Sequence, residues 1–336
     1  MPRPAARPAK SPPPAEPSRP AKSSRPATSS RPATSNRPAE PSRPATSNRP
    51  ATSDRPRPDD PVAADRPLRV GMRLGKYRLD KRLGRGGFAT VYAATDTVLG
   101  VKVALKIPSA MHITPELLAE FRREARLIAR LDHPHILPLR DASFIDGHLV
   151  IVSPLALQTL DQRLHKRIAF ETAFDLLHQL LQGVAHAHER GVIHCDIKPE
   201  NILLFDKSRI RLADFGIARA AQKTVHGSGS GTVGYMAPEQ AMGKPSARSD
   251  VFSVGLLAYR MFAGQWPEYP FDWPFPGAAR VRRRVHPELI AVIRKAVAVK
   301  TRDRYRDAGQ MLSAWEGVRL KAVRFARRHR PGPGKR

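Results

Sequence analysis

Two stretches, GVIHCDIKPENILL at residues 191–204 and LADFG at residues 212–216, decide the fold and chemistry expected of this chain. They contain two carboxylates eighteen positions apart, with a lysine and an asparagine between them. Such groups orient a hydroxyl, hold a divalent metal and neutralise the charge of a phosphoryl group during transfer. It is very improbable that both stretches would occur by chance in this order and at this spacing. The four residues are Asp196, Lys198, Asn201 and Asp214.

The N-terminal segment differs in composition from the rest of the chain. Residues 1–68 hold 18 of the 33 prolines and no aromatic residue. An Arg-Pro pair recurs every six residues from Arg19 to Arg55, without an apolar face on which repeats would stack. Such a segment buries too little apolar surface to offset the entropy lost on ordering. We therefore expect residues 1–70 to be a disordered, low-complexity tail.

The chain of 336 residues has a net charge of +28. The tail contributes 13 basic and 6 acidic residues, a net charge of +7, which leaves +21 for residues 69–336. This excess is typical of a basic soluble protein, and it leaves acidic substrates, nucleic acid and anionic lipid open as partners. No nucleic-acid-reading motif or run of stacking aromatic residues accompanies the charge, so nucleic acid is not expected as the primary partner.

Cysteine content and hydropathy favour a cytoplasmic location. Cys195 is the only cysteine, so the chain forms no internal disulfide, which fits a reducing compartment. No run of about 18 apolar residues is present, so no integral membrane segment is expected. The basic N-terminus also lacks the apolar region of a secretory signal.

A glycine-rich turn is expected near the start of the globular region. The sequence LGRGGFATVY at residues 83–92 indicates strand, turn and strand, and its glycines let backbone amides approach phosphate oxygens. A Rossmann or Walker site requires a helix after the turn, whereas a strand follows here. Taken alone, the turn also fits an ordinary hairpin. Gly84, Gly86 and Gly87 are candidates for contact with phosphate.

The next strand and helix predict a lysine–carboxylate pair. Period-two alternation in the strand at 101–106 places Ala104 and Lys106 on the same face. A helix is predicted to begin at Thr114, with proline at its first position. Glu124 falls near the centre of its apolar stripe, where an unpaired charge is costly to bury, so Lys106 is the expected partner. The stripe consists of Leu117, Phe121, Ile128 and Leu131.

In their order and spacing, these stretches resemble the protein kinase superfamily, in its bacterial, Hanks-type serine/threonine form. The resemblance covers about residues 75–318. It implies that Asp196 orients the substrate hydroxyl and that Lys198 compensates charge at the γ-phosphate. It also implies that the pair of Lys106 and Glu124 positions the phosphates.

The same resemblance implies a nucleotide and a metal. Val91 and Ala104 are expected to enclose the adenine, with Leu203 beneath it. The other nucleotide-binding residues that the resemblance implies are Leu83, Gly84, Gly86, Gly87 and Lys106. Asn201 and Asp214 are the expected metal ligands. Further implied contacts are His194 against Phe215, Glu239 with Arg304, and Asp250 with the catalytic loop.

Two positions depart from the family pattern. Ala89 stands where the third glycine of the turn is usual. Cys195 stands where the family usually has an arginine that pairs with a phosphorylated residue of the activation segment, which puts activation by such phosphorylation in doubt. We expect Cys195 to be a neutral spacer, with a redox switch as the alternative, because nothing in the sequence indicates a lowered thiol pKa. The hydroxyl residues of the segment are Thr224, Ser228, Ser230 and Thr232.

The sequence therefore predicts an α+β, bilobal protein-kinase fold, with a small antiparallel-sheet lobe containing one main helix and a larger, mostly helical lobe. The expected activity is transfer of the γ-phosphoryl group of ATP to serine or threonine of protein substrates, with Mg²⁺ or Mn²⁺. Autophosphorylation is expected too, and an acidic partner is left open for the basic tails. The predicted parts are a kinase domain at 71–318, lobes at about 75–153 and 156–318, and a basic C-terminal tail at 319–336.

Two other classes of protein remain as alternatives. A pseudokinase scaffold is disfavoured because the set Lys106, Glu124, Asp196, Asn201 and Asp214 is complete. A nucleic-acid-binding protein with a kinase-like fold has only the basic charge in its favour. Metal-dependent ATP turnover tests the first alternative, and salt-dependent titration with DNA or RNA tests the second.

Overall fold

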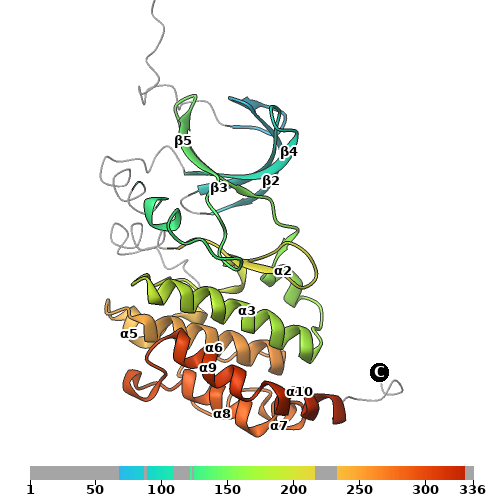
Figure 1. Ribbon diagram of the computed structural model, residues 1–336, viewed down its shortest axis with the longest axis vertical. Helices are drawn as coiled ribbons and strands as arrows, with labels where there is room; N and C mark the ends of the chain where they lie inside the picture. The colour runs from blue at the N-terminus through green and yellow to red at the C-terminus, as the bar shows by residue number, and fades with distance from the viewer. Residues whose placement is uncertain (1–67, 87–88, 109–121, 123–124, 216–232, 330–336) are drawn as a thin grey trace, which may run out of the picture. The chain divides into compact units, whose positions relative to one another are not determined.

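The computed structural model has an antiparallel sheet as its N-terminal lobe and a largely helical C-terminal lobe (Figure 1). This α+β architecture is the one predicted from the sequence. The repeat tail, the predicted helix start at Thr114, and the residues Gly87, Glu124 and Thr232 lie outside the described part of the chain. The structure describes residues 68–86, 89–108, 122, 125–215 and 233–329.

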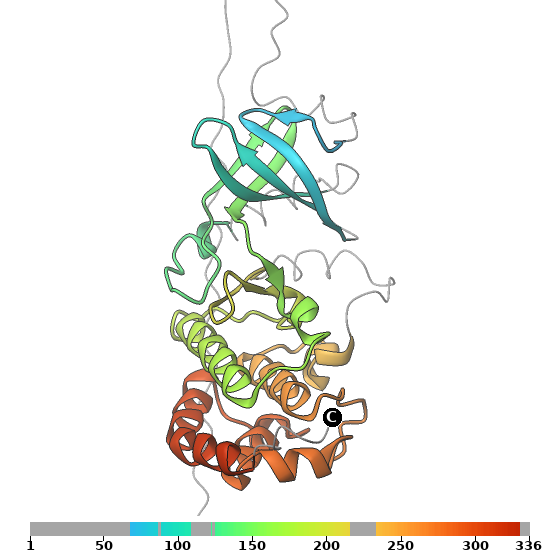
Figure 2. The ribbon, with the colours of Figure 1, turned by 90° about the vertical axis from the view of Figure 1, so that its right-hand side faces the viewer.

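The N-terminal lobe is a six-stranded antiparallel sheet with the strand order β1-β2-β3-β4-β6-β5 (Figure 2). The register of β3 and β4 places Val91 opposite Lys106 and Ala93 opposite Ala104. Its strands are β1 (Arg73–Leu74), β2 (Tyr77–Arg85), β3 (Ala89–Asp96), β4 (Val101–Pro108), β5 (Asp141–Ile145) and β6 (His148–Pro154).

Strand β4 shows how this sheet separates its core from its functional face. Val103, Leu105 and Ile107 are buried, and they alternate with the half-buried Ala104 and Lys106. Successive side chains of a strand point to opposite faces, so the core holds one set and the other face carries the lysine. This arrangement confirms the alternation predicted from the sequence.

A second, three-stranded sheet flanks the segment that contains the predicted catalytic residues. Its order is β7-β8-β9, with antiparallel pairing throughout. The 3₁₀ helix η3 (Pro199–Asn201) leads directly into β8, and Asp214 follows shortly after β9. The sheet therefore fixes both ends of the segment that bears the two predicted metal ligands. The strands are β7 (Gln158–Thr159), β8 (Ile202–Leu204) and β9 (Ile210–Leu212).

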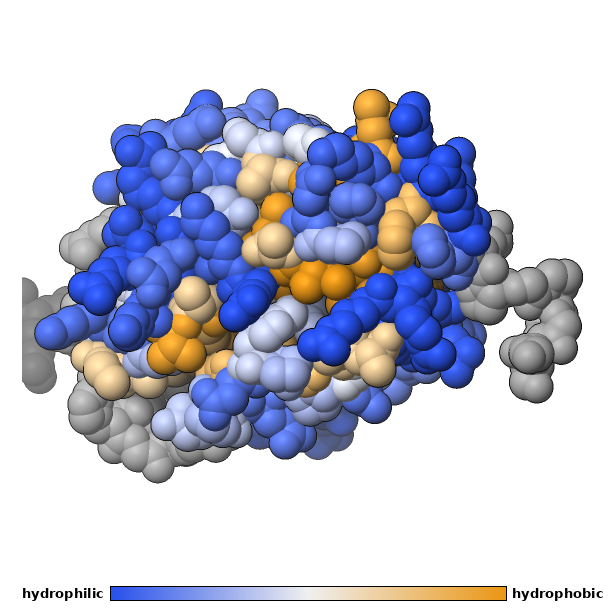
Figure 3. Space-filling view, turned by 90° about the horizontal axis from the view of Figure 1, so that it is seen from below, coloured by the Kyte–Doolittle hydropathy of each residue, from blue (hydrophilic) through white to orange (hydrophobic). Residues whose placement is uncertain are grey.

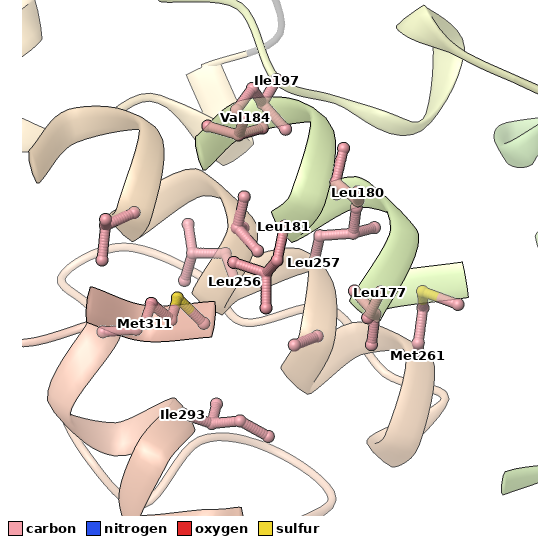
Figure 4. Packing of buried hydrophobic residues seen from close by; sticks show 14 of the residues in the cluster. Leu177, Leu180, Leu181, Val184, Ile197, Leu256, Leu257, Met261, Ile293 and Met311 are labelled. Carbon is pink, nitrogen blue, oxygen red and sulfur yellow. The ribbon is translucent and has the colours of Figure 1, made fainter. Parts of the chain in front are cut away.

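The C-terminal lobe is a bundle of helices around an apolar core (Figure 4). Helix α3 matches the helix predicted at 170–190. Its buried stripe packs against α6 and α9, with the Phe174 ring stacked on Trp315 at 4.7 Å between centroids. The α-helices are α2 (Leu160–Leu164), α3 (Phe170–Glu189), α5 (Pro238–Ala241), α6 (Ala247–Ala263), α7 (Ala278–Arg284), α8 (Pro287–Ala296), α9 (Ala308–Gly317) and α10 (Arg319–Arg328), and the remaining 3₁₀ helices are η4 (Val233–Tyr235) and η5 (Thr301–Asp303).

Helix α6 is the central element of this lobe, and nearly all of its residues are buried. It begins after Ser246, whose backbone N–H donates to Ser249 Oγ at 3.0 Å. It ends at Gly264, where φ is 69°, a left-handed conformation that glycine adopts without a Cβ clash. Three of its polar residues, Ser249, Asp250 and Ser253, are buried, which makes Asp250 significant for the site.

The helical lobe continues beyond residue 318, where the predicted basic tail begins. Residues 319–328 form α10, and Ala322 on this helix is fully buried in the core of the lobe. The prediction of a tail rested on the high density of basic residues. The structure instead forms a helix here, and Ala322 packs into the core from one face of that helix. Within the described residues, no helix combines the length and apolar character required to cross a bilayer.

A cluster of neutral histidines joins the loop before β5 to helix α3. The His133 ring lies 4.7 Å from that of His186 and 5.4 Å from that of His135. Burial, together with the neighbouring His186 and His135, lowers the pKa of His133 to about 4. Burial also lowers the pKa values of His135 and His186. The folded state therefore binds fewer protons than the unfolded state between about pH 6.5 and pH 4.

We expect the free energy of unfolding to be highest above about pH 6.5 and to fall as the pH is lowered toward 4, because protonation favours the unfolded chain. His133→Asn removes one titrating ring and keeps an acceptor for the His135 N–H, which donates to His133 Nδ1 at 3.1 Å. Urea unfolding across this pH range should show a shallower decline for the variant. Equal slopes for the two proteins would contradict the assignment.

Candidate active site

The backbone of the loop at 194–201 is held by one buried carboxylate. Asp250, in α6, accepts hydrogen bonds from the His194 N–H at 2.7 Å and the Cys195 N–H at 2.8 Å. Its Oδ2 also lies 2.9 Å from His188 Nε2. The Ala308 N–H donates to His188 Nδ1, so the proton of that ring is on Nε2, which donates to Asp250. The predicted anchoring role of Asp250 is confirmed.

His194 has a structural role within this loop. Its Nε2 donates to the Ala213 carbonyl at 2.8 Å, and its Nδ1 accepts the Asp196 N–H at 3.2 Å. Its ring packs edge-on against Phe215, with centroids 4.6 Å apart. Both ring nitrogens are committed to the backbone. The geometry thus confirms the predicted contact and is that of a loop residue, with no free ring nitrogen for a base.

The structure brings Asp196, Lys198 and Asn201 together. Lys198 Nζ lies 2.9 Å from Asp196 Oδ2, and Asn201 Nδ2 donates to the same oxygen at 2.9 Å. Asn201 Nδ2 also donates to the Asp196 carbonyl at 2.8 Å. Because both donors engage Oδ2, the other carboxylate oxygen of Asp196 is the one positioned to accept from a hydroxyl.

Asp214 pairs with Lys106 of the N-terminal lobe. The distance from Lys106 Nζ to Asp214 Oδ1 is 2.7 Å. Desolvation alone would raise the pKa of Asp214, but the Lys106 ammonium, with His194 and Lys198, outweighs it and holds the pKa below its ordinary value. Asp214 is therefore ionised at neutral pH. The partner that the sequence predicted for Lys106, Glu124, lies outside the described residues.

Two residues of the site adopt left-handed backbone conformations that non-glycine residues rarely take. The φ angle is 65° at Cys195 and 63° at Asp214. The Cys195 peptide is held on both sides, by Asp250 at its N–H and by Gln240 Nε2 at its carbonyl. Strain of this kind persists only where surrounding contacts fix it, and it clusters at functional sites.

Most of the described residues that were predicted to bind nucleotide lie on the sheet that carries Lys106, whereas Leu203 lies on β8 of the second sheet. Gly84 pairs with Val91 across β2 and β3, and the Gly86 N–H donates to the Ala89 carbonyl at 2.8 Å, which closes the described edge of the turn. Ala104 pairs with Ser153 at the end of β6. Leu83 is half-exposed at the turn, and Leu203 is half-buried on β8, with Gly87 outside the described residues.

A second ion pair, between Arg304 and Glu239, links segments of the C-terminal lobe near the site. Arg304 donates to both carboxylate oxygens of Glu239, at 2.8 and 3.0 Å, as predicted. Burial tends to raise the pKa of Glu239, but Arg304 and Ser249 outweigh it and lower the pKa. The Arg304 guanidinium lies over the Phe252 ring, which belongs to the same helix as Asp250. This pair therefore ties the segment after the activation region to α6.

Sequence reasoning missed two positioning residues. Gln240 bonds the Cys195 carbonyl, and His188 links Asp250 to the start of α9. Neither belongs to a recognisable pattern, because each acts through backbone groups whose proximity depends on the tertiary fold. The only sequence feature that could have pointed to His188 is that it is a polar residue on the face of α3 that was predicted to be buried, where a side chain needs hydrogen-bond partners.

The geometry agrees with a comparison of the sequence to known families. Residues 77–302, more than half of the chain, match the model of the protein kinase domain. The chain belongs to the protein kinase family. The matched range includes Asp196, Lys198, Asn201 and Asp214, whose contacts are described above.

Individual kinases resemble the chain over most of its length. The probable serine/threonine-protein kinase PknB of Lactococcus lactis is 31% identical over 257 residues, which are 71% of this chain and 41% of the relative. The serine/threonine-protein kinase PknL of Mycobacterium bovis is 34% identical over 270 residues, covering 75% and 68%. The chain thus spans about two fifths of the first relative and about two thirds of the second.

Solved structures of kinase domains also resemble this chain. The kinase domain of Mycobacterium tuberculosis PknI is 28% identical, with a TM-score of 0.59, and the match covers 75% of this chain and 99% of that domain. The apo form of PpkA-294 is 22% identical with a TM-score of 0.62, which supports the fold alone.

The donor set of this kinase fits a hard divalent cation. Asn201 uses its Nδ2 for two acceptors on Asp196, which turns its Oδ1 the other way as an oxygen ligand. Asp214 is ionised and engages Lys106 through Oδ1, so Oδ2 remains for a metal. Mg²⁺ is typically bound by one or two protein oxygens plus phosphates and water, and these two side chains match that pattern.

We expect Asp250→Ala to destabilise the kinase by about 2–5 kcal/mol, because two buried N–H groups and His188 lose their acceptor. Turnover should fall at least about tenfold as the loop at 194–201 loosens. Asp250→Asn keeps an oxygen acceptor and should have a smaller effect on both. Denaturant unfolding and initial-rate kinetics provide the measurements.

The matched control is Asp175→Asn, an exposed carboxylate that pairs with Arg319 at 3.2 Å on the surface. Such pairs contribute less than about 1 kcal/mol, so this variant should behave as the unmodified kinase. If Asp250→Ala were no more harmful than this control, the anchoring role would be wrong.

Proposed function

We propose that this kinase transfers the γ-phosphoryl group of ATP to serine or threonine side chains of proteins. The observation that carries the proposal is the convergence of Asp196, Lys198 and Asn201 with the Lys106–Asp214 pair. The family supports ATP as donor, and the names of the relatives support serine and threonine as acceptors. Lys198, two residues after Asp196, is also the form that resembles serine/threonine kinases.

Each residue has a distinct part in this proposal. Asp196 accepts a hydrogen bond from the substrate hydroxyl at the carboxylate oxygen not engaged by Lys198, and takes its proton as the phosphoryl group is transferred. Lys198 and Lys106 place positive charge where negative charge develops on the phosphate oxygens. Asn201 and Asp214 would hold Mg²⁺ or Mn²⁺, which when bound neutralises phosphate charge.

The nucleotide site is proposed to lie against the sheet. Leu83, Val91 and Ala104, with Leu203 of the C-terminal lobe, would contact the adenine, while backbone amides near Gly84, Gly86 and Gly87 would approach the phosphates. Glu124 is proposed to hold Lys106 once the nucleotide has displaced that lysine from Asp214. Autophosphorylation, a cytoplasmic location and an acidic partner for the basic tails also belong to this proposal.

Asp196→Asn and Asp214→Asn should each reduce turnover by at least about 100-fold while leaving the fold intact. The first variant cannot accept the hydroxyl proton, and the second loses the charge that engages Lys106 and the metal. Initial rates on a short serine peptide with ATP and Mg²⁺, together with thermal unfolding, measure both. A tyrosine peptide tests acceptor specificity.

Asp206→Asn is the matched control, since Asp206 caps the exposed turn at 206–209 and touches no site residue. Its turnover should stay close to that of the unmodified kinase. Near-normal turnover in either site variant would overturn the residue assignment. ATP binding by the unmodified protein without any turnover would favour the pseudokinase alternative.

A second prediction concerns regulation. Because Cys195 carries no positive charge to pair with a phosphate, the kinase should be active without phosphorylation of its activation segment. A phosphatase-treated Thr224→Ala/Ser228→Ala/Ser230→Ala variant should keep its peptide turnover within about threefold, a difference under 1 kcal/mol in barrier height. The comparison is unmodified protein that has not been treated with phosphatase. A loss of tenfold or more would show that another basic group serves in place of the usual arginine.

A further inference from the structure

A hollow lined by arginines lies at the end of the helical lobe formed by α7 and α10. Two adjoining cavities, of about 280 and 370 Å³, share the side chains of Arg167, Arg280, Arg284 and His329. Figure 1 shows α7 and α10 at the end of this lobe away from the N-terminal sheet. The hollow is therefore separate from the site around Asp196.

The two cavities differ in their walls. The larger is lined only by basic side chains, Arg283 together with the four that both cavities share. The smaller continues to apolar residues of α3 and α6, among them Phe170, Met261 and Phe262. Figure 3 views this end of the molecule, where apolar side chains are visible between hydrophilic ones. A ligand that fills both would be strongly anionic at one end and apolar at the other.

The arginines of the hollow have no carboxylate partners in the described part of the chain. None of Arg167, Arg280, Arg283 and Arg284 takes part in an ion pair there, and Glu171, at the cavity wall, lies 3.8 Å from Arg327. Burial, followed by the charges of Arg284, Arg167 and Arg283, lowers the pKa of Arg280. Like charges held together in this way repel one another, and an anion between them would remove that repulsion.

The positions of Arg280 and Arg284 are set by helix α7. Arg280 and Arg284 are four residues apart on α7 and therefore lie on one face of that helix. The Arg280 guanidinium also packs at the end of α6, where a Cβ added to Gly264 would lie 3.0 Å from its Nη1. A site that presents its cations in fixed positions loses little side-chain entropy when it binds a ligand.

We propose that this hollow binds a phosphoserine or phosphothreonine side chain of a protein, with the phosphate among the arginines and a neighbouring apolar residue in the smaller cavity. The choice of a phosphorylated protein rests on the proposed function, whose products are such side chains. A phosphomonoester carries about −1.5 to −2 charges and three acceptor oxygens, and guanidinium groups bind it through paired hydrogen bonds. The kinase would thereby hold a phosphorylated substrate while leaving the active site open.

The shape of the hollow favours this occupant over an anionic membrane. Helices that bind a membrane surface present protruding apolar side chains beside their basic ones. Here the apolar residues Phe170, Met261 and Phe262 lie at the cavity wall, and on α7 and α10 the one large hydrophobic residue that is highly exposed is Leu320. A concave cationic pocket suits a single phosphate group better than an extended lipid surface.

The test uses the full chain and a fluorescent, otherwise uncharged peptide with one phosphothreonine flanked by leucines. Fluorescence anisotropy is measured with a non-hydrolysable ATP analogue present at saturation. The phosphopeptide should bind at least about tenfold more tightly than its unphosphorylated twin, and Arg280→Gln/Arg284→Gln should abolish that preference. The same variant should retain turnover on a short unphosphorylated peptide, because neither arginine belongs to the active site.

Arg294→Gln/Arg302→Gln is the matched control, with the same loss of charge at two exposed arginines outside the hollow. It should keep the preference. If the first double variant fails to fold, Arg284→Lys retains the charge without the paired donors and should weaken phosphopeptide binding several-fold. Turnover on the short peptide is a separate readout, so a failed kinase assay with selective phosphopeptide binding would overturn the proposed function and leave the pocket standing.

Three results would overturn the proposal. One is equal binding of the phosphopeptide and its twin. Another is an equal loss of binding in the control variant, which would indicate non-specific charge attraction. The third is binding to phosphatidylglycerol vesicles that depends on Arg280 and Arg284 while the phosphopeptide does not bind, which would identify a lipid headgroup as the occupant.

Discussion

The buried carboxylate of Asp250 is the interaction on which the geometry of the site depends. It belongs to α6, the apolar centre of the helical lobe, and it accepts from two successive backbone amides of the loop that bears Asp196. A carboxylate in such a place is costly unless it is fully hydrogen-bonded, and His188 completes its set of partners. The stability of the core and the position of the reacting groups are thereby coupled through one side chain.

This coupling explains how the chain sustains unfavourable backbone conformations beside the reactive groups. Cys195 and Asp214 both have φ values in the left-handed region, which costs about 1–3 kcal/mol for residues other than glycine. Cys195 is held by Asp250 and Gln240, and Asp214 by its contact with Lys106. The free energy gained by packing of the helices thus offsets the conformational cost of the strained loop.

Much of this site was predictable because its chemistry is local in sequence. Asp196, Lys198 and Asn201 lie within six residues, so the loop that joins them is read directly from the chain. The alternation in β4 and the helix α3 were likewise set by hydrophobic periodicity. Some contacts between distant segments were harder to predict. Gln240 donates to the Cys195 carbonyl without any sequence signal, and His188 contacts both α6 and α9 with only its polar character on a buried helix face as a signal.

The same limit applies to the end of the helical lobe. The basic residues after 318 suggested a tail, because charge dominates that segment, whereas the single buried Ala322 attaches it to the core as a helix. The arginine hollow arises from three separate segments, the loop before α3, helix α7 and the end of α10, so no local pattern encodes it. Only the tertiary fold brings these cations together.

The active site and the arginine hollow differ in how their cationic side chains are paired, and this difference affects how each would bind a phosphate. In the active site every lysine already has a carboxylate beside it, with Lys106 at 2.7 Å from Asp214 and Lys198 at 2.9 Å from Asp196. Under the proposed function, a nucleotide phosphate would compete with these carboxylates for the lysines, and a divalent cation held by Asp214 would lessen that competition. Among the described residues the arginines of the hollow form no ion pair, so an anion there would gain their attraction without displacing a paired carboxylate. The first arrangement suits a nucleotide that must bind, react and leave, and the second suits a ligand that is held while the reaction proceeds elsewhere.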